Sequence, residues 1–188
     1  MRSHVQCVRR LALRSNRPPS AAAELKRQGA QSVPLEVSYS LLAEHVESHA
    51  VVAKWLRSEW PSWYGPGGGG NSVEDVRRYS QVNALPLGLL AFVQRTPCAF
   101  GALKQDSVPG FEHAAPWLGA GYVIPSLRGQ GVGLGLVRAL EVEAKRLGYR
   151  SVYCATSTAN SLMARAGWSH AGDSSLGGKP VAVYRKAS

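Results

Sequence analysis

Four glycines fall within one short stretch, at Gly129, Gly131, Gly133 and Gly135. The stretch follows an apolar run and precedes residues with helical spacing, so side chains are missing where the first amides of a helix lack partners. Those amides and the aligned peptide dipoles favour an anion, above all a phosphate group. Because glycine lets a ligand approach the backbone closely, we expect a phosphate-bearing ligand at this turn.

The elements around the turn form a crossover. Apolar residues recur after it at three- or four-residue spacing: Leu136, Leu140, Ala144 and Leu147. This spacing predicts an amphipathic helix of about four turns, which ends at Gly148. The apolar runs at 120–124 and 151–155 predict strands on either side. Strand, turn, helix and strand together predict a parallel crossover unit.

Two common phosphate-binding motifs do not fit this turn. A P-loop needs Lys and then Ser or Thr after its last glycine, but Gly133 is followed by Leu134. In the dinucleotide motif GxGxxG, the last glycine position is Leu134 when counted from Gly129 and Leu136 when counted from Gly131. The sequence therefore argues against both nucleotide-binding patterns.

The residues from Arg128 to Gly133, RGQGVG, resemble the signature R/Q-x-x-G-x-G/A of the GNAT acetyltransferases. The stretch NSLMARAGW at 160–168 looks like the final helix of that family and its ending. Other stretches look like a bacterial GNAT subgroup with a Trp-rich loop after its first helix: 59–68, 85–92, 101–108 and 116–123. The likeness covers about residues 33–186.

The resemblance implies an α/β (α+β) GNAT fold over residues 34–188. In this fold a central mixed, mostly antiparallel sheet of about six to seven strands is flanked by about four helices. The implied cosubstrate is acetyl-coenzyme A, with its pyrophosphate on the turn and its pantetheine arm along 121–123. The implied binding residues are Tyr122, Val123, Arg128, Gly129, Gln130, Gly131, Val132, Gly133 and Asn160. The Val123 amide is the candidate oxyanion donor, and no metal is required.

The activity implied is transfer of an acetyl group to a primary amine of a small molecule or peptide, by direct attack without a covalent intermediate. Such a reaction requires a positioned amine, a proton acceptor, a hydrogen bond to the oxyanion and a proton for the departing thiolate. Two other functions stay open. One is a non-catalytic acetyl-coenzyme A sensor, and the other is a nucleic-acid-binding protein with a basic arm.

The proton donor departs from the family pattern. Many members carry a tyrosine four residues before the final glycine, but counting back from Gly167 gives Met163, which cannot donate a proton. Tyr122 and Tyr153 are the candidate catalytic residues in its place. Water is the other candidate donor, and packing is the alternative role for both rings.

Several polar and aromatic residues are candidates for the acceptor side. Trp63 and Tyr64 flank a glycine-rich loop and are expected to wall the acceptor pocket. Asp106 is a candidate base, with ordinary loop polarity as its alternative. His45 and His49 lack the HExxH order, so they predict a solvated helix face and no zinc site.

The remaining pattern predicts the other elements of the domain. Strands are expected at 35–38, 87–93, 98–104, 168–171 and 181–185, and helices at 44–60, 73–80 and 158–166. Val46, Val52, Trp55 and Leu56 are expected to face inward on the first helix.

The net charge of +10 is concentrated in the first residues. Residues 1–34 hold seven Lys or Arg and one Glu, which leaves fifteen basic and eleven acidic residues in the rest, a net charge of +4. We expect residues 1–33 to form a basic, disordered leader, and a transit peptide has a similar composition. Since the excess charge lies in this leader, the sequence argues against a nucleic-acid partner for the rest of the chain.

The three cysteines, Cys7, Cys98 and Cys154, lack zinc or CxxC spacing. Their odd number favours free thiols in a reducing compartment, so the expected location is the cytoplasm. The sequence contains no apolar stretch of about 18 residues, which argues against a membrane span. A homodimer is compatible with the sequence.

Overall fold

The computed structural model describes residues 35–187. The leader predicted at residues 1–33 lies outside the described residues, and its disorder stays a prediction. Within 35–187, none of the helices combines the length and the apolar character needed to cross a membrane.

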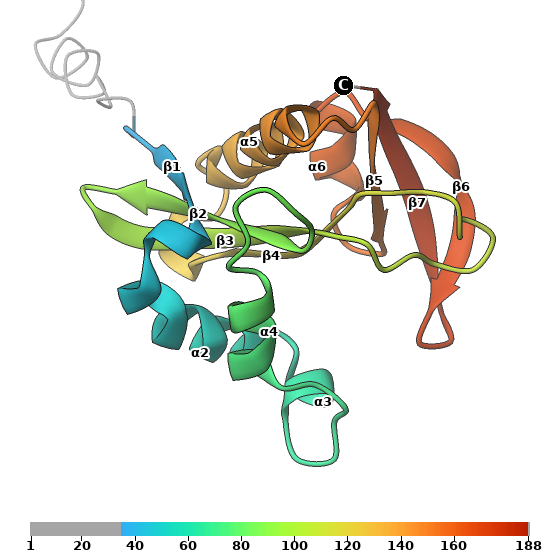
Figure 1. The fold of residues 1–188 in the computed structure, drawn as a ribbon. Coiled ribbons are helices and arrows are strands. Elements are labelled where there is room, and N and C mark those ends of the chain that lie inside the picture. The colour runs from blue at the N-terminus through green and yellow to red at the C-terminus, as the bar shows by residue number, and fades with distance from the viewer. Residues whose placement is uncertain (1–34, 188) are drawn as a thin grey trace, which may run out of the picture. The chain divides into compact units, whose positions relative to one another are not determined.

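One seven-stranded sheet organises the described residues, in the order β1-β2-β3-β4-β5-β7-β6 (Figure 1). Its strands are β1 (Ser38–Leu41), β2 (Leu87–Val93), β3 (Thr96–Lys104), β4 (Trp117–Val123), β5 (Ser151–Thr156), β6 (Ser169–Leu176) and β7 (Lys179–Ala187). Neighbouring strands are antiparallel except β4 and β5, which run parallel. The predicted mixed, mostly antiparallel sheet is confirmed.

Helices lie on both faces of this sheet. They are α2 (His49–Glu59), α3 (Pro61–Tyr64), α4 (Ser72–Arg78), α5 (Val132–Arg146) and α6 (Asn160–Arg165). Figure 1 shows α5 on one face of the sheet and α2 and α4 on the other. Because α5 joins β4 to the parallel strand β5, it is the crossover helix that the sequence predicts.

Each face of the sheet has its own hydrophobic core. Leu136 and Leu140 of α5 pack on one face together with Leu89, whereas α2 packs on the other face around Leu90 and Phe100. Leu89 and Leu90 are successive residues of β2, so the strand alternates between two buried faces. Both faces of the sheet are therefore apolar and covered by helices.

The first helical segment differs from the prediction. Residues 42–48 form two 3-10 turns separated at His45, which has φ −134° and ψ 60°, and the regular helix starts only at His49. This break changes the helical phase, so Val46 is 68% exposed. The prediction that Val46 faces inward is wrong, whereas Val52 and Leu56 are fully buried.

The last helix is shorter than the predicted 158–166. The Thr156 hydroxyl accepts the amides of Thr158 and Ala159, at 3.2 and 2.9 Å. These local hydrogen bonds hold a turn after β5, so α6 begins only at Asn160. The turn therefore fixes the position of the first residues of α6 relative to β4.

The buried cysteines provide a test of this packing. Cys98 and Cys154 are free thiols that are 1% and 5% exposed. Burial raises the pKa of Cys154 to about 12, and burial also raises that of Cys98. At pH 8 both groups are therefore protonated, and alkylation requires the thiolate. We expect iodoacetamide to leave both unmodified in the native protein and to label both in denaturant, as measured by peptide mass spectrometry. Labelling of either thiol in the folded protein would contradict the packing.

Candidate functional site

The glycine turn leads directly into the N-terminus of α5. Gly129 and Gly131 have φ of +76° and +87°, a left-handed conformation that strains residues with a side chain. Gly131 immediately precedes α5, and no side chain caps the helix there. The first-turn amides are therefore available to a ligand, as the sequence predicts for an anion site.

Gly135 and Gly133 have other reasons to lack a side chain. A Cβ at Gly135 would overlap the Tyr39 hydroxyl, which packs over the helix. A Cβ at Gly133 would meet only Val123 Cγ2 at 3.7 Å and Leu162 Cδ2 at 3.8 Å, which are ordinary contact distances. Packing within the described residues thus does not require glycine at Gly133, whereas close approach of a ligand would.

The sheet is interrupted between β4 and β5. These strands pair at a single position, Trp117 with Tyr153, where the Tyr153 amide donates to the Pro116 carbonyl at 2.9 Å. On β4, Ala120 and Gly121 lie opposite the single residue Gly101 of β3. This is a β-bulge, and Ala120 adopts φ +51° within it. Beyond the one pair, the facing edges of β4 and β5 are left open.

The bulge is followed by a backbone amide that faces the open edge. Ile124 donates its amide to the Cys98 carbonyl at 2.9 Å, so Ile124 points toward β3. Because successive residues of an antiparallel strand point to opposite edges, the amide and carbonyl of Val123 point toward β5. Arg128 Nε donates to that carbonyl at 2.9 Å. The amide of Val123 is thus directed into the interrupted part of the sheet.

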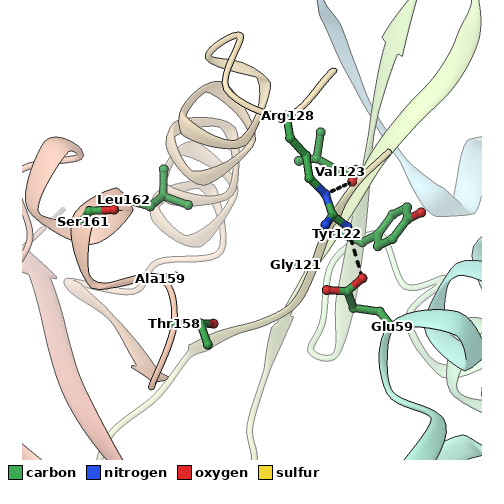
Figure 2. A pocket seen from close by; sticks show the side chains of 9 residues that line it. All are labelled: Glu59, Gly121, Tyr122, Val123, Arg128, Thr158, Ala159, Ser161 and Leu162. Atoms are coloured by element: carbon green, nitrogen blue, oxygen red, sulfur yellow. Dashed lines mark hydrogen bonds and ion pairs between the residues drawn. The ribbon is translucent and has the colours of Figure 1, made fainter. Parts of the chain in front are cut away.

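A cleft of about 330 Å³ occupies the interruption (Figure 2). Its lining comes from the end of α2, from β4 and Arg128 on one side, and from the start of α6 on the other. The lining residues are Glu59, Gly121, Tyr122, Val123, Arg128, Thr158, Ala159, Ser161 and Leu162. Gly133 borders this cleft through Val123 and Leu162. The glycine turn therefore lies next to the cleft, and the two together form the candidate site.

Arg128 carries the main charge contacts of the cleft. Its Nη2 donates to Glu59 Oε2 at 3.1 Å, as the dashed line in Figure 2 shows. The guanidinium carbon lies 5.6 Å from the centre of the Tyr122 ring. The Arg128 and Glu59 side chains are 51% and 38% exposed, so the pair lies in a solvent-accessible cleft.

The two candidate tyrosines lie in different surroundings. Tyr122 lines the cleft, and its ring stacks on Trp55 at a centroid distance of 5.2 Å. Tyr153 packs against Trp117 at 5.5 Å and belongs to a separate cluster with Val183. The lining of the cleft therefore includes Tyr122 but not Tyr153.

The start of α6 forms the second wall. Asn160, a predicted cofactor residue, is its first residue and is exposed, while its neighbours Ala159 and Ser161 line the cleft. Met163 is 1% exposed and packs in the α5-side core. Met163, which stands where the resemblance implies a tyrosine, is therefore a core residue.

The predicted acceptor-side residues do not line this cleft. Trp63 is 54% exposed and packs beside the glycine loop, where a Cβ at Gly69 would lie 3.5 Å from its ring. Tyr64 donates to Asp75 Oδ2 at 2.8 Å, and burial together with this hydrogen bond raises the pKa of Tyr64. Asp106 pairs with Lys104 Nζ at 3.2 Å. Their roles in acceptor binding stay predictions.

The histidines have ordinary polar partners. His45 Nδ1 lies 3.0 Å from Glu47 Oε1, and His49 Nε2 lies 3.1 Å from Ser80 Oγ. Across residues 35–187, groups of three or more His, Cys, Asp or Glu side chains that would hold a metal ion do not occur.

Glu59 is the functional candidate that the sequence did not reveal. It lies 69 residues before Arg128, so no local spacing links the two. Its one local signal is a carboxylate at the C-terminal end of α2, where the helix dipole disfavours negative charge. The sequence also did not single out the lining residues at the start of α6, because the predicted helix at 158–166 concealed the turn that precedes it. These residues are Thr158, Ala159, Ser161 and Leu162.

The burial of Met163 leads to a stability prediction. Met163→Leu nearly conserves volume, so we expect it to cost less than about 1.5 kcal/mol of unfolding free energy. Met163→Tyr would add a ring to a full core, and we expect it to cost about 1–3 kcal/mol. Thermal unfolding of both variants measures the difference. A Met163→Tyr variant as stable as the parent would show that this side of α6 has free space.

The comparisons with known proteins agree with this geometry. Residues 51–167 match a sequence profile described as the acetyltransferase (GNAT) family. No curated protein matches the sequence.

The fold is similar to several solved acetyltransferases. An aminoglycoside 6'-N-acetyltransferase complexed with coenzyme A is 16% identical with a TM-score of 0.64, and the match covers 81% of this chain and 96% of that chain. Aminoglycoside acetyltransferase AAC(6')-Ib in complex with coenzyme A and kanamycin is 19% identical with a TM-score of 0.62, over 81% and 95%. The aminoglycoside 6'-N-acetyltransferase from Enterococcus faecium is 17% identical with a TM-score of 0.62, over 81% and 96%.

At these identities the solved structures establish a shared fold only. The profile, however, matches more than half of the chain and includes both the interrupted sheet and the glycine turn. This protein therefore belongs to the acetyltransferase (GNAT) family.

Proposed function

We propose that this protein transfers an acetyl group from acetyl-coenzyme A to a primary amine of a small molecule or peptide, by direct attack. The observation that carries the proposal is the cleft between β4 and β5, into which the Val123 amide points and next to which the glycine turn lies. A site of this shape offers backbone donors to both ends of a long, phosphate-bearing thioester.

The residues present fit acetyl-coenzyme A. The first-turn amides of α5, from Gly131 to Gly133, would bind the pyrophosphate, since they are uncapped and the helix end is electropositive. The open edge of β4 from Gly121 to Val123 would bind the pantetheine arm as an added strand. Arg128 and Gln130 lie at the turn, and Asn160 lies beside the opposite wall.

The bound cosubstrate supplies a reactive acetyl thioester. The Val123 amide would donate a hydrogen bond to the thioester oxygen as negative charge develops there, a contribution that grows where water is excluded. The walls of the cleft would hold the amine in line with the carbonyl carbon. Neither step needs a covalent link to the protein.

The lining of the cleft guides the choice of acceptor amines. The cleft carries one carboxylate and no other negative side chain among its lining residues. Kanamycin, bound by AAC(6')-Ib, carries several amines and is the first compound to screen, followed by spermidine and a peptide with a free amino terminus.

Two measurements test the proposed function. Isothermal titration with coenzyme A measures binding, and release of free thiol from acetyl-coenzyme A measures transfer to each amine. We expect both binding and amine-dependent thiol release. Binding without turnover on any amine would favour an acetyl-coenzyme A sensor, and absence of binding would overturn both functions.

Gly133 tests the assignment of the turn. We expect Gly133→Val to weaken coenzyme A binding at least about tenfold, because its side chain would occupy the space left for the pyrophosphate. Gly133→Ala is the matched control, since the family signature accepts Ala there and a Cβ has only ordinary contacts at 3.7 and 3.8 Å. Calorimetry measures the affinities, and thermal unfolding checks the fold.

Equal affinity of the Gly133→Val variant and the parent would contradict the turn as the phosphate site. Gly131 is a poorer test, since its φ of +87° would strain any side chain whether or not a ligand binds.

The tyrosines test proton delivery to the thiolate. We expect Tyr153→Phe to leave kcat unchanged, because this ring packs outside the cleft. A loss of about 10²-fold in kcat for Tyr122→Phe, with coenzyme A affinity unchanged, would assign the proton transfer to this phenol. Full activity of both variants would leave water as the donor.

A further inference from the structure

Glu59 is the only carboxylate among the residues that line the cleft. It is the last residue of α2, which packs on the face of the sheet opposite to α5. The cleft therefore extends from α6 on the α5 side to Glu59 on the α2 side (Figure 2). If the thioester binds along α5 and α6, the second substrate has to enter from the side where Glu59 lies.

The position of Glu59 is electrostatically costly in the free protein. A carboxylate at the C-terminal end of a helix faces the negative end of the helix dipole. Arg128 provides a compensating positive charge, with Nη2 at 3.1 Å from Glu59 Oε2. The same guanidinium is held by the Val123 carbonyl at 2.9 Å and by the Tyr122 ring. In this arrangement, the Glu59 carboxylate is paired with Arg128 and is not available to a cationic amine.

The pair is suited to partner exchange. Both side chains remain partly exposed, at 51% and 38%, and an ion pair in such surroundings is weak. Arg128 is also adjacent to Gly129, the first residue of the glycine turn. A pyrophosphate offers the guanidinium more charge and more acceptor oxygens than one carboxylate does. Binding at the turn would therefore draw Arg128 away from Glu59.

We propose that Glu59 binds the acceptor amine and accepts its proton. Arg128 releases Glu59 for this role only when the cosubstrate is bound. This inference rests on the proposed acetyl transfer and extends it to the order of binding. The acceptor class that follows is a cationic amine, because the released carboxylate would bind an ammonium group.

The released carboxylate would then act in the chemical step. It accepts one proton from the ammonium group, which leaves a neutral amine and a protonated Glu59. The nitrogen lone pair forms the new N–C bond to the acetyl carbon while the C–S bond breaks. The sulfur leaves as a thiolate and takes up the second proton that the nitrogen loses as the amide forms, and the protonated Glu59 returns its proton to solvent.

Coenzyme A affinity tests the exchange without any acceptor. We expect Glu59→Gln to bind coenzyme A about two- to fivefold more tightly than the parent, because binding no longer breaks an ion pair. In an Arg128→Gln background, Glu59→Gln should give no such gain. A gain of equal size in both backgrounds would point to general charge repulsion between Glu59 and coenzyme A. It would overturn the proposed release of Glu59 by Arg128.

Turnover tests the role toward the amine. With an amine that the parent acetylates, we expect Glu59→Gln to lower kcat/KM for that amine by about 10²-fold. Glu143→Gln is the matched control, because Glu143 also pairs with an arginine, Arg146 at 2.8 Å, but lies outside the cleft. It should leave both coenzyme A affinity and turnover unchanged.

The two arms separate this inference from the proposed function. If kanamycin, spermidine and the peptide are all inert with the parent, the proposed transfer to these amines fails. The coenzyme A affinities of the parent, the two single variants and the double variant still support or contradict the release of Glu59 by Arg128. If the parent is active and Glu59→Gln retains full kcat/KM, the proposed transfer stands and the role of Glu59 is wrong.

Discussion

The architecture depends on the loss of backbone pairing between β4 and β5. A sheet interior normally satisfies every amide and carbonyl within its ladders, and here the ladder stops after Trp117 and Tyr153. Beyond that pair, the backbone groups of β4 that face β5 have no strand partner, and the Val123 carbonyl is bound by Arg128 instead. The hydrophobic cores on the two faces of the sheet are built mainly on β2 and β3, which remain paired along their length. A binding edge thus exists without an exposed strand at the border of the sheet.

The bulge in β4 adds direction to this open edge. Ala120 and Gly121 against Gly101 shift the register by one residue, and without that shift Val123 would present the other side of its backbone to the cleft. The same alternation sends Tyr122 toward Trp55 and Val123 toward the α5 core. One extra residue therefore determines both the exposed amide and the aromatic wall.

Local signals predicted much of the fold, because they act over a few residues. The glycines, the helical spacing of α5 and the strands around it depend on neighbours in the sequence, and each was predicted close to its observed bounds. The break at His45 was not predictable from apolar spacing. Val46 fits the helical spacing of the apolar residues, but it lies in a 3-10 turn before the regular helix and is exposed. Ala120 has no composition signal for positive φ. The contact between Glu59 and Arg128 joins distant segments, and only the folded sheet brings them together.

Tyr39 links the first strand of the sheet to the helix that carries the glycine turn. Its hydroxyl packs where Gly135 lacks a side chain, two residues after Gly133, and β1 pairs along one edge with β2, through four residue pairs. The first strand thus packs, through Tyr39, on the helix that carries the turn. Fraying of β1 would remove this contact from one side of α5. The order of the first strand is consequently coupled to that of the helix end that carries the glycine turn.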